Sequence, residues 1–216
     1  MARLQTAIAE RSPPAWEPPA APRVAGCFVC FPRGEHGPGA AGDPAVAAAV
    51  VLQGGRVVGT RIVHGAAGAA YTPGLLALRE GPLLASAVDS LEPRPDVVLV
   101  DATGRDHPRR AGLAMHLGWA LEIPTIGVTH RPLLAEGAWP ADTAGAASPL
   151  RIEGEVVGCW LRTRSGARPL AVHAGWRTTA RTACDILRPL CHVRTPEPLR
   201  QARRLARAER SSPAVG

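Results

Sequence analysis

Two acidic side chains in this sequence, Asp101 and Glu80, occupy positions from which they could bind a metal ion. Asp101 directly follows an apolar run at 96–100, and Glu80 ends an amphipathic helical segment in otherwise apolar surroundings. Carboxylate oxygens are the ligands that Mg²⁺ prefers, and a metal held in this way polarises phosphate and generates hydroxide for hydrolysis. On spacing alone the signal is weak, because an aspartate at the end of a strand caps the next loop at least as often.

The segment around Asp101 has the pattern of a βαβ unit. A strand at 96–100, apolar in every residue after Asp96, is followed by a loop, an amphipathic helix carrying Leu113–Leu121 and a second strand at 123–128. A continuous apolar run is typical of a strand buried on both faces of a sheet. Ligands bind outside the carboxyl ends of such strands, so the pattern places Asp101 at the edge where chemistry is expected.

The rest of the chain predicts an α/β fold: a mixed central sheet flanked by helices. An antiparallel meander opens the chain, since Gln53-Gly54-Gly55-Arg56 is typical of a hairpin turn, and parallel strands follow in the βαβ unit. The predicted strands are 24–31, 45–52, 57–64, 96–100, 123–128, 156–161 and 170–173. The predicted helices are 2–10, 75–80, 83–91, 113–121, 178–190 and 199–209, and 137–149 is a low-complexity loop.

The composition favours a globular protein with an anionic partner. The 216 residues suit one domain, and the net charge of +7 comes entirely from arginine. Excess positive charge attracts nucleic acid, although codon bias explains it equally well. An arginine cluster at 200–210 has the further alternative of a solvated helix face. No apolar run reaches the roughly 20 residues of a membrane span, so no membrane partner and a cytoplasmic location are expected.

Five cysteines do not predict a disulfide framework in a chain of this kind. Cys27 and Cys30 have the spacing of a metal knuckle, but they fall inside a predicted strand and no second pair accompanies them. Residues three apart on a strand point to opposite faces. The pattern therefore favours structural thiols over a zinc site.

Several short motifs, in order along the chain, resemble the endonuclease V family, which nicks nucleic acid beside deaminated adenine (inosine). They are Val24-Ala25-Gly26, Tyr71-Thr72-Pro73-Gly74, Leu78-Arg79-Glu80, Val100-Asp101, His107-Pro108-Arg109-Arg110, Pro124-Thr125-Ile126-Gly127-Val128, Gly175 with Arg177, and Pro196-Glu197-Pro198. The resemblance implies an RNase H-like fold, which agrees with the predicted order of strands. We expect a helix and proline-rich connector at 1–22, one domain at 23–210 and a frayed tail at 211–216.

The resemblance implies a Mg²⁺ (or Mn²⁺) site in which Glu80 and Asp101 keep two of four family positions. Phe28 stands where the family has its first aspartate, and Trp176 where the motif comparison puts a late histidine. His130 replaces an expected lysine near the site.

These departures fall on the chemistry. Phenylalanine has no lone pair for a metal, and tryptophan offers only a donor. Cleavage is therefore expected to be weakened or lost, unless Glu35, Asp43 or His173 rebuilds the site.

The positions that the resemblance assigns to substrate recognition match the family more fully than the positions of the metal ligands do. Tyr71 matches the aromatic of a wedge motif, followed by Pro73, and His107 with Arg109 matches the loop near the scissile phosphate. A base everted from the stack needs a pocket of small or apolar residues. The matching positions are Leu76, Gly104, Gly112, Leu113, Gly127 and Leu133.

Three functions remain open on these residues. The first is a protein that binds inosine-containing DNA or RNA but has lost metal-dependent cleavage. The second is an active Mg²⁺-dependent nuclease of nucleic-acid repair, and the third is a non-catalytic interaction module that reuses the fold. A monomer is expected in each case. The retained pocket positions and the arginines favour the first.

Overall fold

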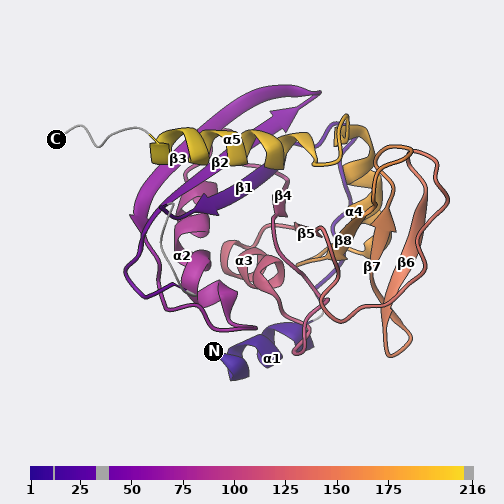
Figure 1. Ribbon diagram of the computed structural model, residues 1–216, viewed down its shortest axis with the longest axis horizontal. Helices are drawn as coiled ribbons and strands as arrows, with labels where there is room; N and C mark the ends of the chain where they lie inside the picture. The colour runs from indigo at the N-terminus through magenta and orange to yellow at the C-terminus, as the bar shows by residue number, and fades with distance from the viewer. Residues whose placement is uncertain (12, 33–38, 212–216) are drawn as a thin grey trace.

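The computed structural model describes residues 1–11, 13–32 and 39–211, which form one eight-stranded sheet with helices on both faces (Figure 1). The strands, in spatial order, are β3 (Arg56–Ala66), β2 (Pro44–Gln53), β1 (Val24–Cys30), β4 (Val97–Val100), β5 (Thr125–Thr129), β8 (Leu170–Ala174), β7 (Glu155–Leu161) and β6 (Ala147–Ile152). The helices are α1 (Ala2–Glu10), α2 (Leu76–Asp89), α3 (Leu113–Leu121), α4 (Ala180–Leu187), the short 3₁₀ helix η1 (Arg188–Leu190) and α5 (Glu197–Ser211).

The sheet has the predicted mixed topology. β1, β2 and β3 form the antiparallel meander, and β1, β4 and β5 run parallel to one another. The remaining three strands continue antiparallel from β5 through β8 and β7 to β6. The hairpin between β2 and β3 turns through Gly54 and Gly55, both with positive φ, as the Gly-Gly pair predicted.

Alternate residues of the central strands face two different helix layers. On one face, Cys27 of β1 and Val100 of β4 pack against α2 and α3. On the other, Leu99 packs beneath α4 and α5, and Phe28 and Cys30 lie beneath α5. The two thiols of the Cys27/Cys30 pair thus point to opposite faces, as expected, and do not form a metal knuckle.

Two elements differ from the prediction. α2 is one continuous helix through Pro82, where two shorter helices were expected, because packing against the sheet holds the helix despite the missing N–H. β6 lies partly inside the segment expected to be a loop and contains Pro149. β6 is an edge strand, so a residue without an N–H is tolerated there.

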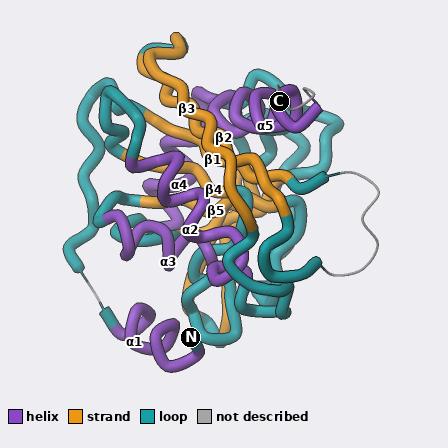
Figure 2. Tube along the Cα trace, turned by 90° about the vertical axis from the view of Figure 1, so that its left-hand side faces the viewer, coloured by secondary structure: helices purple, strands orange, loops and turns teal. Residues whose placement is uncertain are grey.

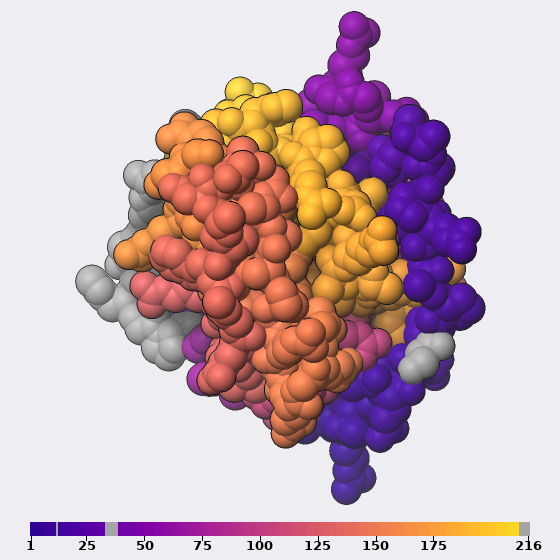
Figure 3. All heavy atoms as spheres, turned by 90° about the vertical axis from the view of Figure 1, so that its right-hand side faces the viewer, coloured from indigo at the N-terminus to yellow at the C-terminus, as the bar shows by residue number. Residues whose placement is uncertain are grey.

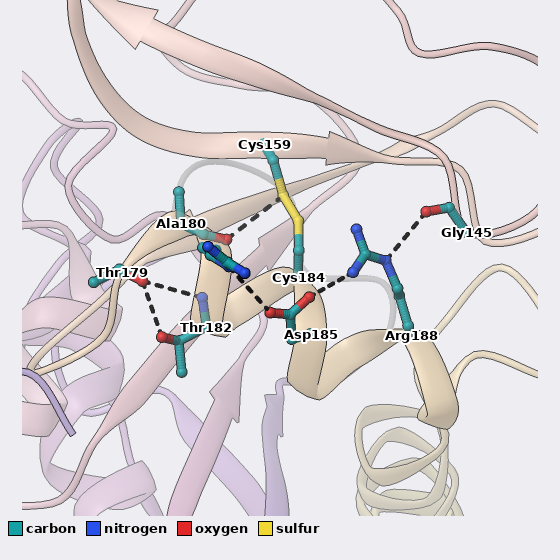
Figure 4. Close-up of a disulfide and its surroundings, with 9 residues drawn as sticks. Gly145, Cys159, Thr179, Ala180, Thr182, Cys184, Asp185 and Arg188 are labelled. Atoms are coloured by element: carbon teal, nitrogen blue, oxygen red, sulfur yellow. Dashed lines mark hydrogen bonds and ion pairs between the residues drawn. A yellow bond between two sulfur atoms is a disulfide. The ribbon is translucent and has the colours of Figure 1, made fainter. Parts of the chain in front are cut away.

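A disulfide joins Cys159 on β7 to Cys184 on α4 (Figure 4). This bridge differs from the expectation that the cysteines form no disulfide framework, and no spacing pattern announces it, since its two cysteines lie 25 residues apart. Cys27, Cys30 and Cys191 are free thiols. The bridge lies within the core beneath α4, on the part of the sheet that β7 and β8 supply.

The N-terminal segment lies against the domain rather than in the sheet. α1 packs on α3, at a distance from the strands (Figure 2). The proline-rich connector then follows the surface past α4 (Figure 3), held where the Trp16 N–H donates to the Arg177 carbonyl at 2.7 Å. Among the described residues, no helix is long and apolar enough to span a bilayer.

Candidate active site

Strand pairing brings Asp101 and Phe28 to the same edge and the same face of the sheet. Cys27 of β1 pairs in parallel with Val100 of β4, so the next residues along the two strands, Phe28 and Asp101, are neighbours. Leu99, two residues before Asp101, faces α5, and side chains two apart share a face. The position where the family resemblance expects a second carboxylate therefore holds an aromatic ring beside Asp101.

α5 places a cation against this carboxylate. Arg203 Nη2 lies 2.7 Å from Asp101 Oδ2, and the two side chains are only 19% and 29% exposed. The guanidinium also lies 5.5 Å from the centre of the Phe28 ring, and that of Arg207 lies 5.4 Å from it. A cation over an aromatic face is attracted by the ring quadrupole. Asp101 and Phe28 together therefore hold Arg203.

Glu80 is the second surviving acid and feels the charge of the first. Its side chain is half-buried on α2, on the opposite face of the sheet from α5. Burial, and after it the negative charge of Asp101, raise the pKa of Glu80 to about 7, although Arg79 partly offsets both effects. Near neutral pH Glu80 is therefore protonated in a large fraction of molecules and is a poor ligand for a cation.

The space beside Asp101 is small. A cavity of about 10 Å³ is lined by Asp101, His130, Arg203 and residues of β5, β8 and α5. This is about the room that one water molecule needs. Partial burial and the charges of Arg194 and Arg203 lower the pKa of His130, so its ring is predominantly neutral at pH 7.

A divalent cation does not fit these residues. Among the described residues, no group of three or more His, Cys, Asp or Glu side chains is placed to hold a metal ion. The one strand-end carboxylate, Asp101, already has a guanidinium against it, and its neighbour Phe28 has no lone pair. A cation entering here would have to displace Arg203 and would meet a single free carboxylate.

Asp43 and His173, two of the three residues considered as replacement metal ligands, form contacts elsewhere. Asp43 forms an ion pair with Arg79 at 2.7 Å, and this arginine lowers its pKa. His173 is fully buried, with Nε2 2.8 Å from the Thr129 hydroxyl and Nδ1 3.5 Å from Asp106. Neither can reach Asp101 without breaking these contacts. The third candidate, Glu35, lies outside the described residues.

Trp176 is not part of this site. Its side chain is buried in a small cluster with residues of α1 and α3, and its backbone N–H donates to the Thr125 hydroxyl at the start of β5. Asp101 lies beside the other end of β5, with His130. A five-residue strand separates the two ends by about 15 Å. Trp176 therefore lies apart from Asp101, and α5 supplies the neighbour of this carboxylate instead.

The proposed wedge turn and the His107–Arg109 loop meet at one atom. The carbonyl oxygen of Gly74, which ends the turn 71–74, lies 3.1 Å from His107 Nε2 and accepts from Arg109 Nη2 at 3.0 Å. His107 is buried there, and burial lowers its pKa. Tyr71 stands on the turn with its side chain 44% exposed, and Pro73 beside it is also exposed.

The expected pocket residues divide into two groups. Gly104, Gly112 and Gly127 pack against backbone: an added Cβ would lie 2.1–2.4 Å from the carbonyl oxygens of Ala174, Thr103 and Ala102. Their lack of a side chain is thus required by close packing of the loop after β4. Of the leucines, Leu113 is buried, Leu76 is half-buried and Leu133 is 53% exposed.

Two residues of these sites were missed in the sequence. Arg203 was assigned to a cluster with a solvated face as its alternative, yet Leu199, Ala202 and Ala206 are buried and bracket it at helical spacing. That periodicity would have placed Arg203 beside the apolar face. Gln5, on α1, is buried and contacts both Gly74 and Arg109. No local pattern signals it, because its partners are 69 and 104 residues away.

The comparisons with known proteins agree on one family. The endonuclease V sequence family matches residues 6–204. An endonuclease V from Methanopyrus kandleri is 44% identical over 169 residues, covering 77% of this chain and 73% of that protein. The structure of endonuclease V from Streptomyces avermitilis superimposes with a TM-score of 0.84 at 36% identity, covering 96% of this chain and 91% of that one.

A third structure shares the fold at lower identity. Endonuclease V from Ciona intestinalis, in complex with a 23-mer DNA containing an inosine followed by a ribo-adenosine, matches with a TM-score of 0.79 at 22% identity and covers 96% of this chain and 94% of that one. The fold and the strand-end acid define this protein as an α/β protein of the RNase H-like class. Within that class, the chain belongs to the endonuclease V family.

Proposed function

We propose that this protein recognises deaminated purine (inosine) in DNA or RNA, and that its metal-dependent phosphodiester cleavage is weakened or lost. Endonuclease V proteins are in general metal-dependent nucleases, and the Ciona intestinalis protein was crystallised on inosine-containing DNA. One observation carries the second half of the proposal: the Asp101 carboxylate is engaged by Arg203 across the ring of Phe28.

Recognition rests on the turn and the arginines rather than on an ion. An everted base costs a few kcal/mol of unstacking, which an aromatic side chain filling the gap offsets. Tyr71 is exposed on a turn fixed by hydrogen bonds and suits that role, with Pro73 beside it. We assign the neighbouring Arg109 loop to the strand's phosphates, and Leu76, Leu113 and Leu133 to the sides of the base.

The test measures binding and cleavage on matched duplexes of DNA and of RNA with one inosine or one adenine. With EDTA present, wild-type protein is expected to prefer the inosine strands, with affinity that falls as salt rises. With Mg²⁺ or Mn²⁺ added, little or no nicked product is expected. Tyr71→Ala should reduce inosine binding by about tenfold or more, whereas Val58→Ala, an exposed residue of β3, serves as the matched control.

Each half of the proposal can fail separately. Efficient nicking that Asp101→Ala abolishes would establish the alternative, an active Mg²⁺-dependent nuclease, and overturn the loss of cleavage. Equal binding of inosine and adenine strands would overturn the recognition. Absence of any nucleic-acid binding at low salt would leave only the interaction module.

A further inference from the structure

The carbonyl oxygen of Gly74 is contacted by three side chains from two segments, α1 and the loop 107–111. Gln5 Nε2 donates to it at 3.0 Å from α1, and Arg109 Nη2 at 3.0 Å, while His107 Nε2 lies at 3.1 Å. A carbonyl can only accept, so His107 carries its proton on Nε2 and its Nδ1 accepts from the Arg109 backbone N–H at 3.2 Å. One neutral tautomer therefore satisfies both contacts.

Gln5 uses its whole amide in this network. Its second N–H donates to the carbonyl of Ala111 at 3.0 Å, and its Oε1 accepts from Arg109 Nε at 2.6 Å. The side chain is 1% exposed. Gln5 thus connects α1 with the turn 71–74 and with the loop 107–111, and it also orients the guanidinium of Arg109.

The other end of the turn is fixed independently. The Tyr71 N–H donates to the Gly39 carbonyl at 3.1 Å. The segment that follows Gly39 is held by Arg79, which donates to the Ala40 carbonyl and to the Asp43 carboxylate, both at 2.7 Å. The turn is therefore clamped at both ends, and Tyr71 projects from it into solvent.

We propose that Gln5 is a positioning residue for inosine recognition, acting by fixing the Tyr71 turn and Arg109 before nucleic acid binds. This inference rests on the proposed function. A side chain that is ordered in advance loses less entropy on binding, so more of its contact energy is available for affinity. α1 lies outside the sheet and supplies neither Asp101 nor Glu80. In this view it is part of the recognition surface.

The test compares Gln5→Leu and Gln5→Glu with Thr6→Ala, a change at the exposed neighbour on α1 whose hydroxyl donates to the Ala2 carbonyl of the same helix. Leucine removes the amide. Glutamate keeps an acceptor for Arg109 but offers no donor to the Gly74 and Ala111 carbonyls when ionised. Both Gln5 variants should lower the preference for inosine over adenine duplex by roughly three- to thirtyfold. Gln5→Leu, which adds no charge beside Arg109, should keep the salt slope of the wild-type protein.

A second measurement reports the turn directly. Tyr71 is the single tyrosine of the chain, so 3-fluorotyrosine labelling gives one ¹⁹F resonance. In the Gln5 variants this resonance should shift or broaden, whereas Thr6→Ala should leave it unchanged. Folding of each variant is checked by circular dichroism, and Gln5→Glu stands in if Gln5→Leu does not fold.

The outcomes separate the inference from the function beneath it. Folded Gln5 variants with wild-type inosine preference and a wild-type ¹⁹F signal would overturn the positioning role. A changed signal with unchanged preference would also overturn it, because the turn would then move without consequence. If the wild-type protein itself shows no inosine preference, the proposed function fails, while the ¹⁹F comparison still decides whether Gln5 fixes the turn.

Discussion

The carboxyl edge around Asp101 and the turn that carries Tyr71 belong to one protein but handle their polar groups in opposite ways. At the edge, the guanidinium of Arg203 faces inward and is engaged by an acid of the same chain. At the turn, the polar groups satisfy one another and leave an aromatic ring facing outward. The charged groups at the edge therefore neutralise one another within the protein, whereas the turn keeps an exposed aromatic side chain that a binding partner can contact.

A substitution that displaces α5 should have the largest effect, because it would disturb the edge around Asp101 and leave the Tyr71 turn unchanged. An added Cβ on Gly26 of β1 would lie 2.4 Å from the backbone of Pro198 and 2.5 Å from that of Leu199. We expect Gly26→Ala to lower the free energy of unfolding by about 3 kcal/mol and to separate Arg203 from Asp101, without altering the ¹⁹F signal of Tyr71. Urea denaturation measures the first effect.

The matched control for that substitution is Gly81→Ala in α2. The nearest atoms to its added Cβ lie 3.9 Å away, and alanine is a better helix former than glycine. Gly81→Ala should therefore stabilise by about 0.5–1 kcal/mol. Equal effects of the two substitutions would show that α5 does not rest closely on β1.

Metal binding tests whether Arg203 is what keeps a divalent cation from the carboxyl edge around Asp101. Wild-type protein should show no rise in Tm with Mn²⁺, because Arg203 already occupies the carboxylate. The double variant Phe28→Asp/Arg203→Gln supplies a second acid and removes the cation. It should gain about 5–10 °C at a Mn²⁺ concentration a hundredfold above Kd. Arg203→Gln alone is the control, and a wild-type gain of the same size would contradict the misfit of the metal.

Glu80 should make the edge sensitive to pH in metal-free buffer. Its pKa is about 7 in the folded protein, above its ordinary value of 4.5, so between these values the folded state binds more protons than the unfolded state. Stability therefore falls as pH rises through this window, by up to about 3 kcal/mol. Glu80→Gln should remove that fall. An unchanged pH profile of unfolding in the variant would show that the Glu80 carboxyl is not perturbed.

The smallest expected effect concerns Asp101. Asp101→Ala frees the guanidinium of Arg203 and removes a negative charge, so metal-free affinity for nucleic acid should rise by a few fold. The slope of log K against log salt should steepen by about 0.9, the value for one further phosphate contact. Weaker binding by the variant would mean that the carboxylate itself assists recognition.

Patterns of local origin were predicted well from the sequence. The continuous apolar run of β4, the Gly-Gly hairpin and the βαβ unit follow from neighbouring residues, so the central sheet and the place of Asp101 at its edge could be expected. β6 and the continuity of α2 could not, because packing rather than propensity allows a proline in each.

The site was predicted less completely because its decisive contacts are long-range. Arg203 meets Asp101 from 102 positions further along the chain, and Gln5 meets Arg109 from 104 positions before it. Composition marks arginines as solvent-facing, and only the three-dimensional packing of α5 turns one of them inward. The same limit applies to Trp176, because a motif gives an order along the chain but not which end of β5 a residue reaches.

The place of α5 along the chain has a consequence for how the protein matures. All eight strands precede it, so a ribosome-bound chain can complete the sheet while Arg203 is still inside the exit tunnel. During that interval the Asp101 carboxylate lacks the guanidinium that later pairs with it, so this edge of the sheet is more negative than in the finished protein. Docking of α5 then supplies Arg203, so the nascent chain and the finished protein should differ in the charge of this edge.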